Sequence, residues 1–270
     1  MGRMNKEKIV LALGMFDGVH AGHKKLIETA KEQAYAYNAM CCVYTYLNHP
    51  ATLLNRKVKM LTSAEQRKEL LIHSGADRVI MDEFTQKIRN TPANEFLDFL
   101  KTKFDPCCIV AGFNYTYGMN CKGTPDTLTE FCSENGIQTV ILDPVQIDGE
   151  TVSSTSIRSH IENGRIDRAE SLLMRPYSVS GSFQDNENIY RICTEYVLPI
   201  SGLYSGFFMD ENGGEHTATL RIHEGYIAEP YVLTGASFRN AEDIRFTFCN
   251  RIDTGTYRDY DKNCECIQGK

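Results

Sequence analysis

The sequence has no long apolar run and no excess of basic residues. No stretch of the chain approaches the ~18 consecutive apolar residues that a membrane-spanning helix needs. Its 29 Lys and Arg residues are outnumbered by 35 Asp and Glu residues, which gives a net charge of −6. Binding along a nucleic-acid backbone depends on a broad basic surface. We therefore expect neither a membrane protein nor a nucleic-acid-binding protein.

The pattern of a secreted protein is also missing. Residues 1–8 are polar and lead directly into a strand-like segment, which is unlike a signal peptide. The ten cysteines include the adjacent pairs Cys41-Cys42 and Cys107-Cys108 in apolar runs, and neighbours on a strand point to opposite faces. Cys264 and Cys266 form a C-x-C pair that is too sparse for a zinc site. We expect reduced structural thiols and a cytoplasmic protein.

Strand-like and helical segments alternate over the first two thirds of the chain. Five short apolar runs are predicted as strands: 8–13, 41–46, 78–81, 108–111 and 137–142. Helical patterns are present at 23–37, 63–73, 92–100, 124–134, 154–162 and 165–173. Regular β-α alternation predicts an α/β fold with a Rossmann-like, doubly wound parallel sheet. Ligands of such sheets bind at the carboxyl ends of the strands.

The character of the sequence changes after Arg175-Pro176-Tyr177. Strand-like segments separated by Gly, Asn and Asp clusters follow at 189–198, 203–209, 216–222 and 244–249. No helical pattern lies between them, which predicts a small antiparallel β domain. The expected organisation is therefore a nucleotide-binding domain over residues 1–177 and a β domain over residues 178–270.

A histidine-rich motif follows the first predicted strand and leads into a helix. Gly14 to His23 contains neither the G-x-G-x-x-G fingerprint nor a P-loop, and its core is His20-x-Gly22-His23. Histidines three residues apart meet on one face of a helical turn, and glycine lets the backbone approach a ligand. Imidazoles at a helix N-terminus can bind a phosphate and stabilise the charge that develops during its transfer. The alternatives are two unrelated histidines or half of a metal site.

A second motif, Ser153-Ser154-Thr155-Ser156-Ile157-Arg158, follows the fifth strand at a predicted helix start. Hydroxyl groups and free backbone amides at that position can hold phosphate oxygens, and Arg158 can add a bidentate contact. Taken alone, the same residues favour an ordinary N-cap, which needs no ligand. Because both motifs follow strands of one predicted sheet, we expect them to form two walls of a triphosphate cleft.

Together the two motifs resemble those of the prokaryotic riboflavin kinase/FAD synthetase family, within the wider His-x-Gly-His nucleotidyltransferases. The resemblance covers about residues 8–181 and includes the segments 45–50, 61–67, 111–118 and 172–177. It implies an FMN adenylyltransferase that transfers AMP from ATP to the phosphate of FMN and releases pyrophosphate, with Mg²⁺ accompanying ATP. Because FMN brings its own nucleophilic phosphate, positioning and charge stabilisation suffice for this reaction.

Carried over residue by residue, the resemblance implies three sets of site residues. The catalytic set is His20, His23 and Arg158. The ATP-binding set is Gly14, Phe16, Asp17, Gly22, Ser154, Thr155 and Arg158. The flavin-binding set is Asn48, Asn114, Tyr115 and Tyr117, and no residue is predicted to bind a metal ion. Two roles stay open for Asp17, which can orient the His-x-Gly-His turn or cap the turn that follows it.

The C-terminal part departs from the family pattern. Gly181 is followed by Ser182-Phe183-Gln184-Asp185-Asn186-Glu187-Asn188, and the family's Pro-Thr-x-Asn stretch does not occur anywhere in the sequence. This departure predicts a shortened riboflavin-kinase-like β-barrel without kinase activity. Two alternatives to an FMN adenylyltransferase are a non-catalytic flavin- or nucleotide-binding pseudoenzyme and a sister nucleotidyltransferase that acts on another phosphorylated acceptor.

Overall fold

In the computed structural model, the described residues are 7–54, 58–183, 189–210, 213–223, 227–232 and 243–252. The predicted C-x-C pair, Cys264 and Cys266, lies outside them, as do residues 184–188 of the segment that departs from the family pattern. The chain forms two compact units, Met1–Ser153 and Ser154–Lys270. The domain boundary after residue 177 stays a prediction, whereas the compact units divide earlier in the chain.

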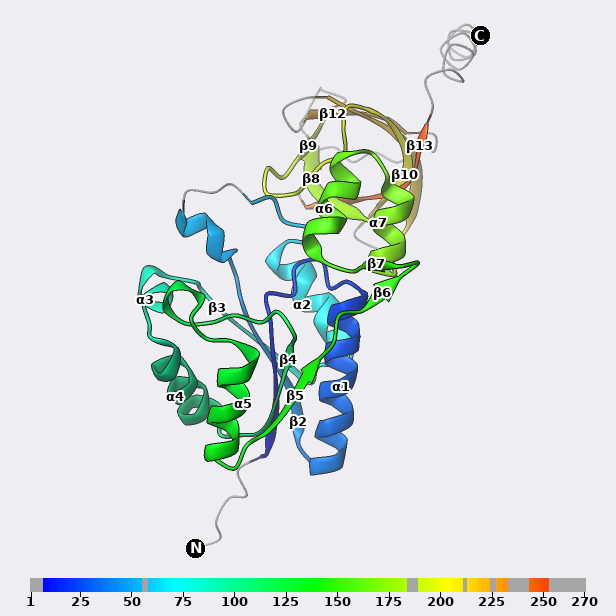
Figure 1. The fold of residues 1–270 in the computed structure, drawn as a ribbon. Coiled ribbons are helices and arrows are strands. Elements are labelled where there is room, and N and C mark those ends of the chain that lie inside the picture. Colours follow the sequence, from blue (N-terminus) through cyan, green and yellow to red (C-terminus); the bar gives the residue numbers. More distant parts are fainter. Residues whose placement is uncertain are drawn as a thin grey trace, which may run out of the picture. The chain divides into compact units, whose positions relative to one another are not determined.

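A five-stranded parallel sheet, in the order β3-β2-β1-β4-β5, forms the centre of the first unit's described residues (Figure 1). Its strands are β1 (Ile9–Leu13), β2 (Met40–Tyr46), β3 (Arg78–Asp82), β4 (Pro106–Gly112) and β5 (Gln138–Leu142). All neighbouring strands pair in parallel, which confirms the predicted α/β fold. The winding reverses between β1 and β4, and this switch point is where such sheets bind ligands.

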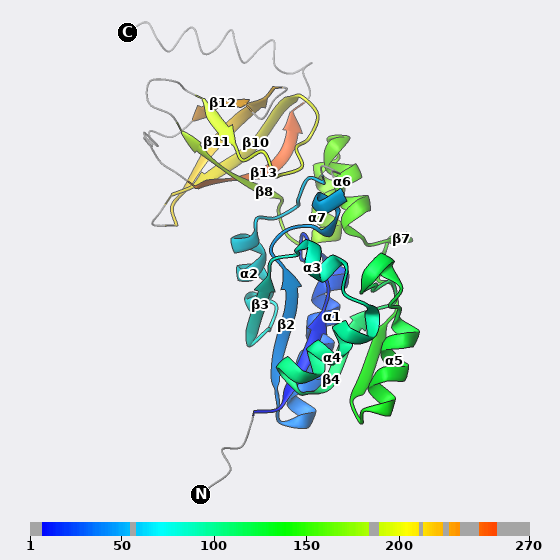
Figure 2. The ribbon, with the colours of Figure 1, turned by 90° about the vertical axis from the view of Figure 1, so that its left-hand side faces the viewer.

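Helices cover both faces of this sheet (Figures 1 and 2). One face packs on α1 (Ala21–Tyr37) and α2 (Ala64–His73), and the other packs on α4 (Ala93–Phe104) and α5 (Pro125–Glu134). Cys41 belongs to the first core cluster and Cys42 to the second, as expected for neighbours on a strand. The shorter elements are η1 (Pro50–Leu54), α3 (Gln86–Arg89), η2 (Met119–Cys121), β6 (Gln146–Ile147) and β7 (Glu150–Thr151). All eight cysteines within the described ranges are free thiols.

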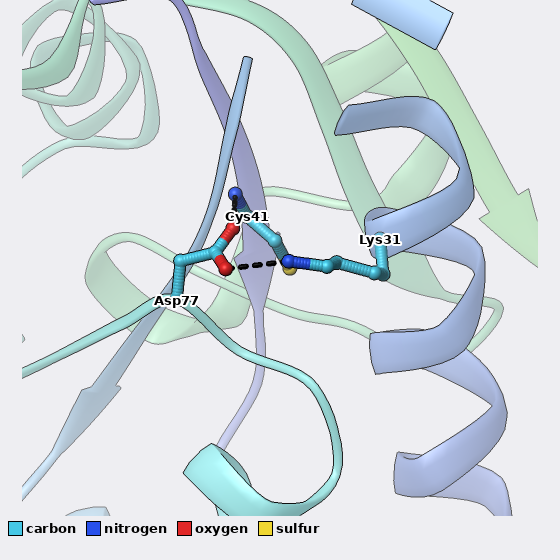
Figure 3. A network of polar contacts seen from close by, with 3 residues as sticks. All are labelled: Lys31, Cys41 and Asp77. Atoms are coloured by element: carbon cyan, nitrogen blue, oxygen red, sulfur yellow. Dashed lines mark hydrogen bonds and ion pairs between the residues drawn. The ribbon is translucent and has the colours of Figure 1, made fainter. Parts of the chain in front are cut away.

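One carboxylate joins three elements near the amino ends of the strands (Figure 3). Asp77, just before β3, accepts a hydrogen bond from the backbone N–H of Cys41 in β2 at 2.8 Å and another from Lys31 in α1. Partial burial acts to raise the pKa of Asp77, but the hydrogen bonds from Lys31 and Cys41 outweigh it and hold that pKa below its usual value. This network is structural and lies at the end of the sheet away from the His-x-Gly-His motif.

The second unit begins with α6 (Ser154–Glu162) and α7 (Ile166–Leu173) and continues as a closed barrel. The described strands of the barrel are β8 (Ser178–Phe183), β9 (Tyr190–Ile192), β10 (Gly202–Met209), β11 (Glu215–Ile222), β12 (Ile227–Val232) and β13 (Ile244–Ile252). They pair antiparallel in the order β10-β11-β12-β9-β8-β13, which confirms the predicted antiparallel β domain. The sequence did not predict β8 or β12, and the strand predicted at 189–198 is shorter than expected.

Aromatic rings fill much of the barrel core. The Phe208 ring lies 4.9–5.1 Å from the ring centroids of Phe183, Tyr190 and Phe246, and the Phe208 side chain is fully buried. The Tyr190 hydroxyl donates a hydrogen bond to the carbonyl of Ile244, so its polar atom is satisfied inside the barrel. Across all of the described ranges, no helix has both the length and the apolar character needed to cross a membrane.

Candidate functional site

The loop between β1 and α1 has an unusual backbone. Phe16, Gly18 and Val19 have φ angles of 54°, 84° and 41°. A positive φ is an outlier for a β-branched residue such as valine, and a strained residue of this kind costs about 1–3 kcal/mol. The Phe16 and Val19 side chains are fully buried in the core cluster on the α1 face, and this packing holds the loop in place. Strain that is maintained in this way is typical of functional sites.

Asp17 fixes this loop to the segment that precedes α2. Its buried carboxylate accepts hydrogen bonds from the backbone N–H groups of Leu61, at 3.0 and 3.1 Å, and Thr62, at 3.3 Å. The Thr62 hydroxyl oxygen in turn accepts a hydrogen bond from the N–H of Gly18 at 3.3 Å. Leu61 is 44 residues away in sequence, so these hydrogen bonds tie the loop to a distant segment of the chain. The predicted contact between Asp17 and ATP stays a prediction.

Two further contacts support the beginning of the loop. The Thr45 hydroxyl of β2 donates a hydrogen bond to the carbonyl of Met15 at 3.0 Å. A Cβ at Gly14 would lie 3.0 Å from the Phe16 ring, so an alanine there would require the ring to move. Gly14 and Phe16, both predicted to bind ATP, are therefore also structural neighbours.

The structure brings the two predicted catalytic histidines into direct contact. The rings of His20 and His23 stack with centroids 3.6 Å apart and planes inclined by 17°. His20 caps α1, because its Nδ1 accepts a hydrogen bond from the N–H of His23 at 3.4 Å. In neutral His20 the proton therefore resides on Nε2. A Cβ at Gly22 would press on the His20 ring at 3.3 Å, which explains the glycine between the two histidines.

The second histidine has a strongly perturbed environment. The Phe16 ring packs edge-on against the His23 ring at 5.2 Å. Nδ1 of His23 is buried and has no hydrogen-bond partner among the described residues. Burial is the main cause that lowers the pKa of His23 well below 6.5, and the nearby His20 and Arg67 lower it further. His23 is therefore a neutral imidazole at pH 7.

Arg67 is a site neighbour that sequence reasoning missed. Its side chain is 0% exposed, and its Nη2 donates hydrogen bonds to the carbonyls of Tyr46, at 2.6 Å, and Leu47, at 2.9 Å. Nε and Nη1 of Arg67 are buried and lack a hydrogen-bond partner within the described ranges. One feature of the sequence could have indicated the burial of Arg67. Arg67 lies four residues before Leu71, and this spacing places both side chains on the inner face of α2.

Asn48, predicted to bind flavin, is hydrogen-bonded to the backbone of Phe84. Its Oδ1 accepts a hydrogen bond from the N–H of Phe84 at 2.8 Å, and its Nδ2 donates to the carbonyl of Phe84 at 3.1 Å. The Phe84 ring packs edge-on against Tyr46 at 4.9 Å. Asn48 thus ties the loop after β2 to the loop after β3, and any flavin contact by Asn48 stays a prediction.

The other predicted flavin-binding residues follow β4. The Tyr115 and Tyr117 rings stack at 5.7 Å, and Tyr117 also packs on Phe96 at 5.6 Å. The Tyr117 hydroxyl forms a hydrogen bond with the Thr127 hydroxyl at 2.9 Å. Tyr117 is buried, Tyr115 is half-buried, and Asn114 is exposed. Asn114 and Tyr115 are therefore the more accessible of the three, whereas Tyr117 belongs to the core.

Residues of the second motif lie at the start of α6, in the second compact unit. Thr155 is exposed, and Ser154 and Arg158 are partly exposed. Ile157 between them is buried. The expectation that these residues and the histidine pair form one cleft stays a prediction.

The His-x-Gly-His motif thus lies at the N-terminus of α1, directly after the first strand of a parallel sheet, with its two imidazole rings stacked. A family model described as FAD synthetase matches residues 2–156. A bifunctional riboflavin kinase/FMN adenylyltransferase of Listeria monocytogenes is 30% identical over 227 residues, which cover 79% of this chain and 71% of the relative. An FAD synthetase of the same organism is 29% identical and covers 72% of this chain and 79% of that relative. The chain belongs to the FAD synthetase family.

The comparisons also include a further curated relative and a solved structure. A bifunctional riboflavin kinase/FMN adenylyltransferase of Bacillus subtilis is 28% identical, over 73% of this chain and 66% of the relative. A solved structure, described as a macrolide-efflux protein from Streptococcus pneumoniae, matches with a TM-score of 0.84. That match covers 97% of this chain and 94% of the other at 21% identity, so it supports the fold alone.

Proposed function

We propose that this protein is an FMN adenylyltransferase, which transfers AMP from ATP to the phosphate of FMN and so produces FAD and pyrophosphate. Membership of the FAD synthetase family supports the reaction. The proposed site of this reaction rests on one observation, the stacked rings of His20 and His23 at the N-terminus of α1. The two histidines lie on a strained loop beside the switch point of the sheet. We expect a cytoplasmic enzyme, in line with the sequence analysis.

The transfer is a displacement at the α-phosphorus of ATP. An oxygen of the FMN phosphate attacks this phosphorus, the bond to the bridging oxygen of the β-phosphate breaks, and pyrophosphate leaves with the electron pair. His20 is placed to donate from its Nε2–H to a phosphoryl oxygen, because its Nδ1 already accepts a hydrogen bond from the helix backbone. The N-terminus of α1 adds the positive end of its dipole.

His23 contributes as a neutral imidazole, since burial and its neighbours lower its pKa. It can therefore form a hydrogen bond to a phosphoryl oxygen without bringing a net charge into the site. A magnesium ion bound together with ATP would supply neutralisation of the charge on the departing pyrophosphate. Across the part of the chain that the structure describes, no group of three or more His, Cys, Asp and Glu side chains is placed to hold a metal ion.

The remaining binding roles rest on the family resemblance. Ser154, Thr155 and Arg158 hold the triphosphate in this proposal, and the glycine-rich backbone around Gly14 and Gly22 lets ATP approach. On the flavin side, the exposure of Asn114 and the half-buried ring of Tyr115 favour these two residues over the buried Tyr117. A flavin ring could stack on Tyr115 in the way that aromatic rings generally do.

We also propose that the barrel has no riboflavin kinase activity. The support is the sequence, which lacks the Pro-Thr-x-Asn stretch that the family's kinase domain uses for magnesium and nucleotide. One relative carries the name FAD synthetase alone, whereas the others reported above are named as bifunctional.

Product analysis after incubation of the pure protein with ATP and magnesium, once with FMN and once with riboflavin, tests both proposals. FAD formed from FMN alone is the expected result. FMN or FAD formed from riboflavin would contradict the loss of kinase activity. If neither tube contains a product, the transferase assignment is wrong, and retention of bound FAD or ATP would then favour a pseudoenzyme.

A further inference from the structure

Arg67 is the most unusual buried charge in the first unit. Its guanidinium has no exposed surface, and among the described residues its hydrogen bonds go only to the carbonyls of Tyr46 and Leu47. Two of its nitrogen atoms, Nε and Nη1, remain without a hydrogen-bond partner there. A buried charge with incomplete hydrogen bonding is costly, and an apolar side chain of similar volume is often neutral or stabilising in such a place. Stability alone therefore does not account for an arginine at this position.

The position of Arg67 connects it to the histidine loop. From the inner face of α2 it holds the carboxyl end of β2, and the backbone of Leu61, three residues before α2 begins, holds the loop through Asp17. Its charge acts on the His23 imidazole, whose Nδ1 is likewise buried without a partner in the described ranges. Because Arg67 has no exposed atom, it acts through these neighbours and not by touching a phosphate.

The charged and titratable groups around this pair come from three elements. His23 of α1 faces its own cap residue His20 and, from α2, Arg67. Arg67 in turn interacts electrostatically with Asp17 of the loop and with Glu65 at the start of α2. A positive charge near an imidazole disfavours its protonation, so Arg67 acts in the same direction as the burial of His23.

We propose that Arg67 is a positioning residue for the adenylyl transfer, which fixes the end of β2 and acts on the imidazole of His23 through its buried positive charge. This inference rests on the proposed function for its effect on turnover. The contact network itself, however, exists whether or not the protein makes FAD. Arg67 supplies no atom to the substrates, and its contribution is the placement of the loop and the protonation state of His23.

The test compares Arg67→Met, which removes the charge while retaining an extended side chain, with Arg67→Lys, which retains the charge. Titration of the His23 ring by NMR of the full chain with ¹⁵N-labelled histidine is the primary measurement. In Arg67→Met the pKa of His23 is expected to rise, and in Arg67→Lys it is expected to stay near the wild-type value. The acidic limb of the rate of FAD formation should move to higher pH in Arg67→Met only.

Several outcomes would overturn this inference. An unchanged His23 titration and an unchanged pH profile in Arg67→Met, with only a loss of stability, would reduce Arg67 to a structural residue. If Arg67→Met does not fold, the same NMR titration of the wild-type protein tests the inference. A His23 pKa at or above 6.5 would contradict the inference directly. Absence of FAD formation would refute the proposed function while the NMR titration still tests the coupling of Arg67 to His23.

Discussion

The loop between β1 and α1 and the core of the barrel use their buried residues in opposite ways. In and beside the loop, backbone strain at Phe16 and Val19 coincides with two buried charges, Asp17 and Arg67. The barrel core consists largely of aromatic rings in mutual contact, around Phe208 for example, and the Tyr190 hydroxyl inside it is hydrogen-bonded. We conclude that the packing of the barrel core serves stability. The strained backbone and buried charges of the loop are costly in free energy, and only a function explains why they are maintained.

The largest effect on stability is expected in the barrel. Phe208→Ala removes a fully buried ring that contacts Phe183, Tyr190 and Phe246, and should lower the free energy of unfolding by about 3–5 kcal/mol. Denaturant unfolding followed by circular dichroism measures the loss. The rate of FAD formation per folded molecule should not change. Phe207→Ala, on the opposite face of the same strand and less buried, is the control and should cost clearly less.

A smaller effect is expected where the loop is anchored. In Asp17→Asn an amide N–H₂ replaces one of the two acceptor oxygens. Because the backbone N–H of Leu61 faces both oxygens, it then meets a second donor, at a cost of about 1–3 kcal/mol. Turnover should fall as well, because the loop carries the histidines. Asp77→Asn is the matched control, since Asp77 accepts a backbone N–H at the other end of the sheet. Equal losses of turnover in both variants would contradict the special role of the loop.

The smallest effect is a pH dependence of stability. The pKa of His23 is lowered in the folded protein but is about 6.5 in the unfolded chain. Below pH ~6.5 the unfolded state therefore binds a proton that the folded state does not, and stability falls as the pH decreases toward the folded-state pKa. The contribution is at most about 1.4 kcal/mol per pH unit. Unfolding measured from pH 7.5 to 5 should show a shallower slope in His23→Gln, and an identical slope would contradict the lowered pKa.

Local patterns were sufficient for much of this structure. The five apolar runs became β1 to β5, and the strand-to-helix placement of His20 and His23 predicted their meeting, because a helical turn brings residues three apart together. β8 escaped prediction because its sequence, Ser178–Phe183, is rich in small polar residues, with a glycine that leaves room for the carbonyl of Arg191. β12 contains Pro230, and a proline argues against a strand.

Other features depended on tertiary contacts that no local pattern encodes. Positive φ angles at Phe16 and Val19 are imposed by packing, since neither residue favours them. The partners of Arg67 come from the end of β2, about 20 residues earlier in the chain, so its burial could not be inferred from α2 alone. The amide of Asn48 is likewise engaged by Phe84, which lies 36 residues away.

The most direct test of the account is the single-turnover rate of FAD formation from ATP and FMN by His23→Ala, measured beside His73→Ala. His73 is exposed at the end of α2 and serves as the matched control. The account predicts a loss of roughly 100- to 1,000-fold in His23→Ala, as for the removal of one well-placed hydrogen-bond donor, with unchanged circular dichroism and a wild-type rate in His73→Ala. A wild-type rate in His23→Ala would show that the histidine loop is not the site of AMP transfer.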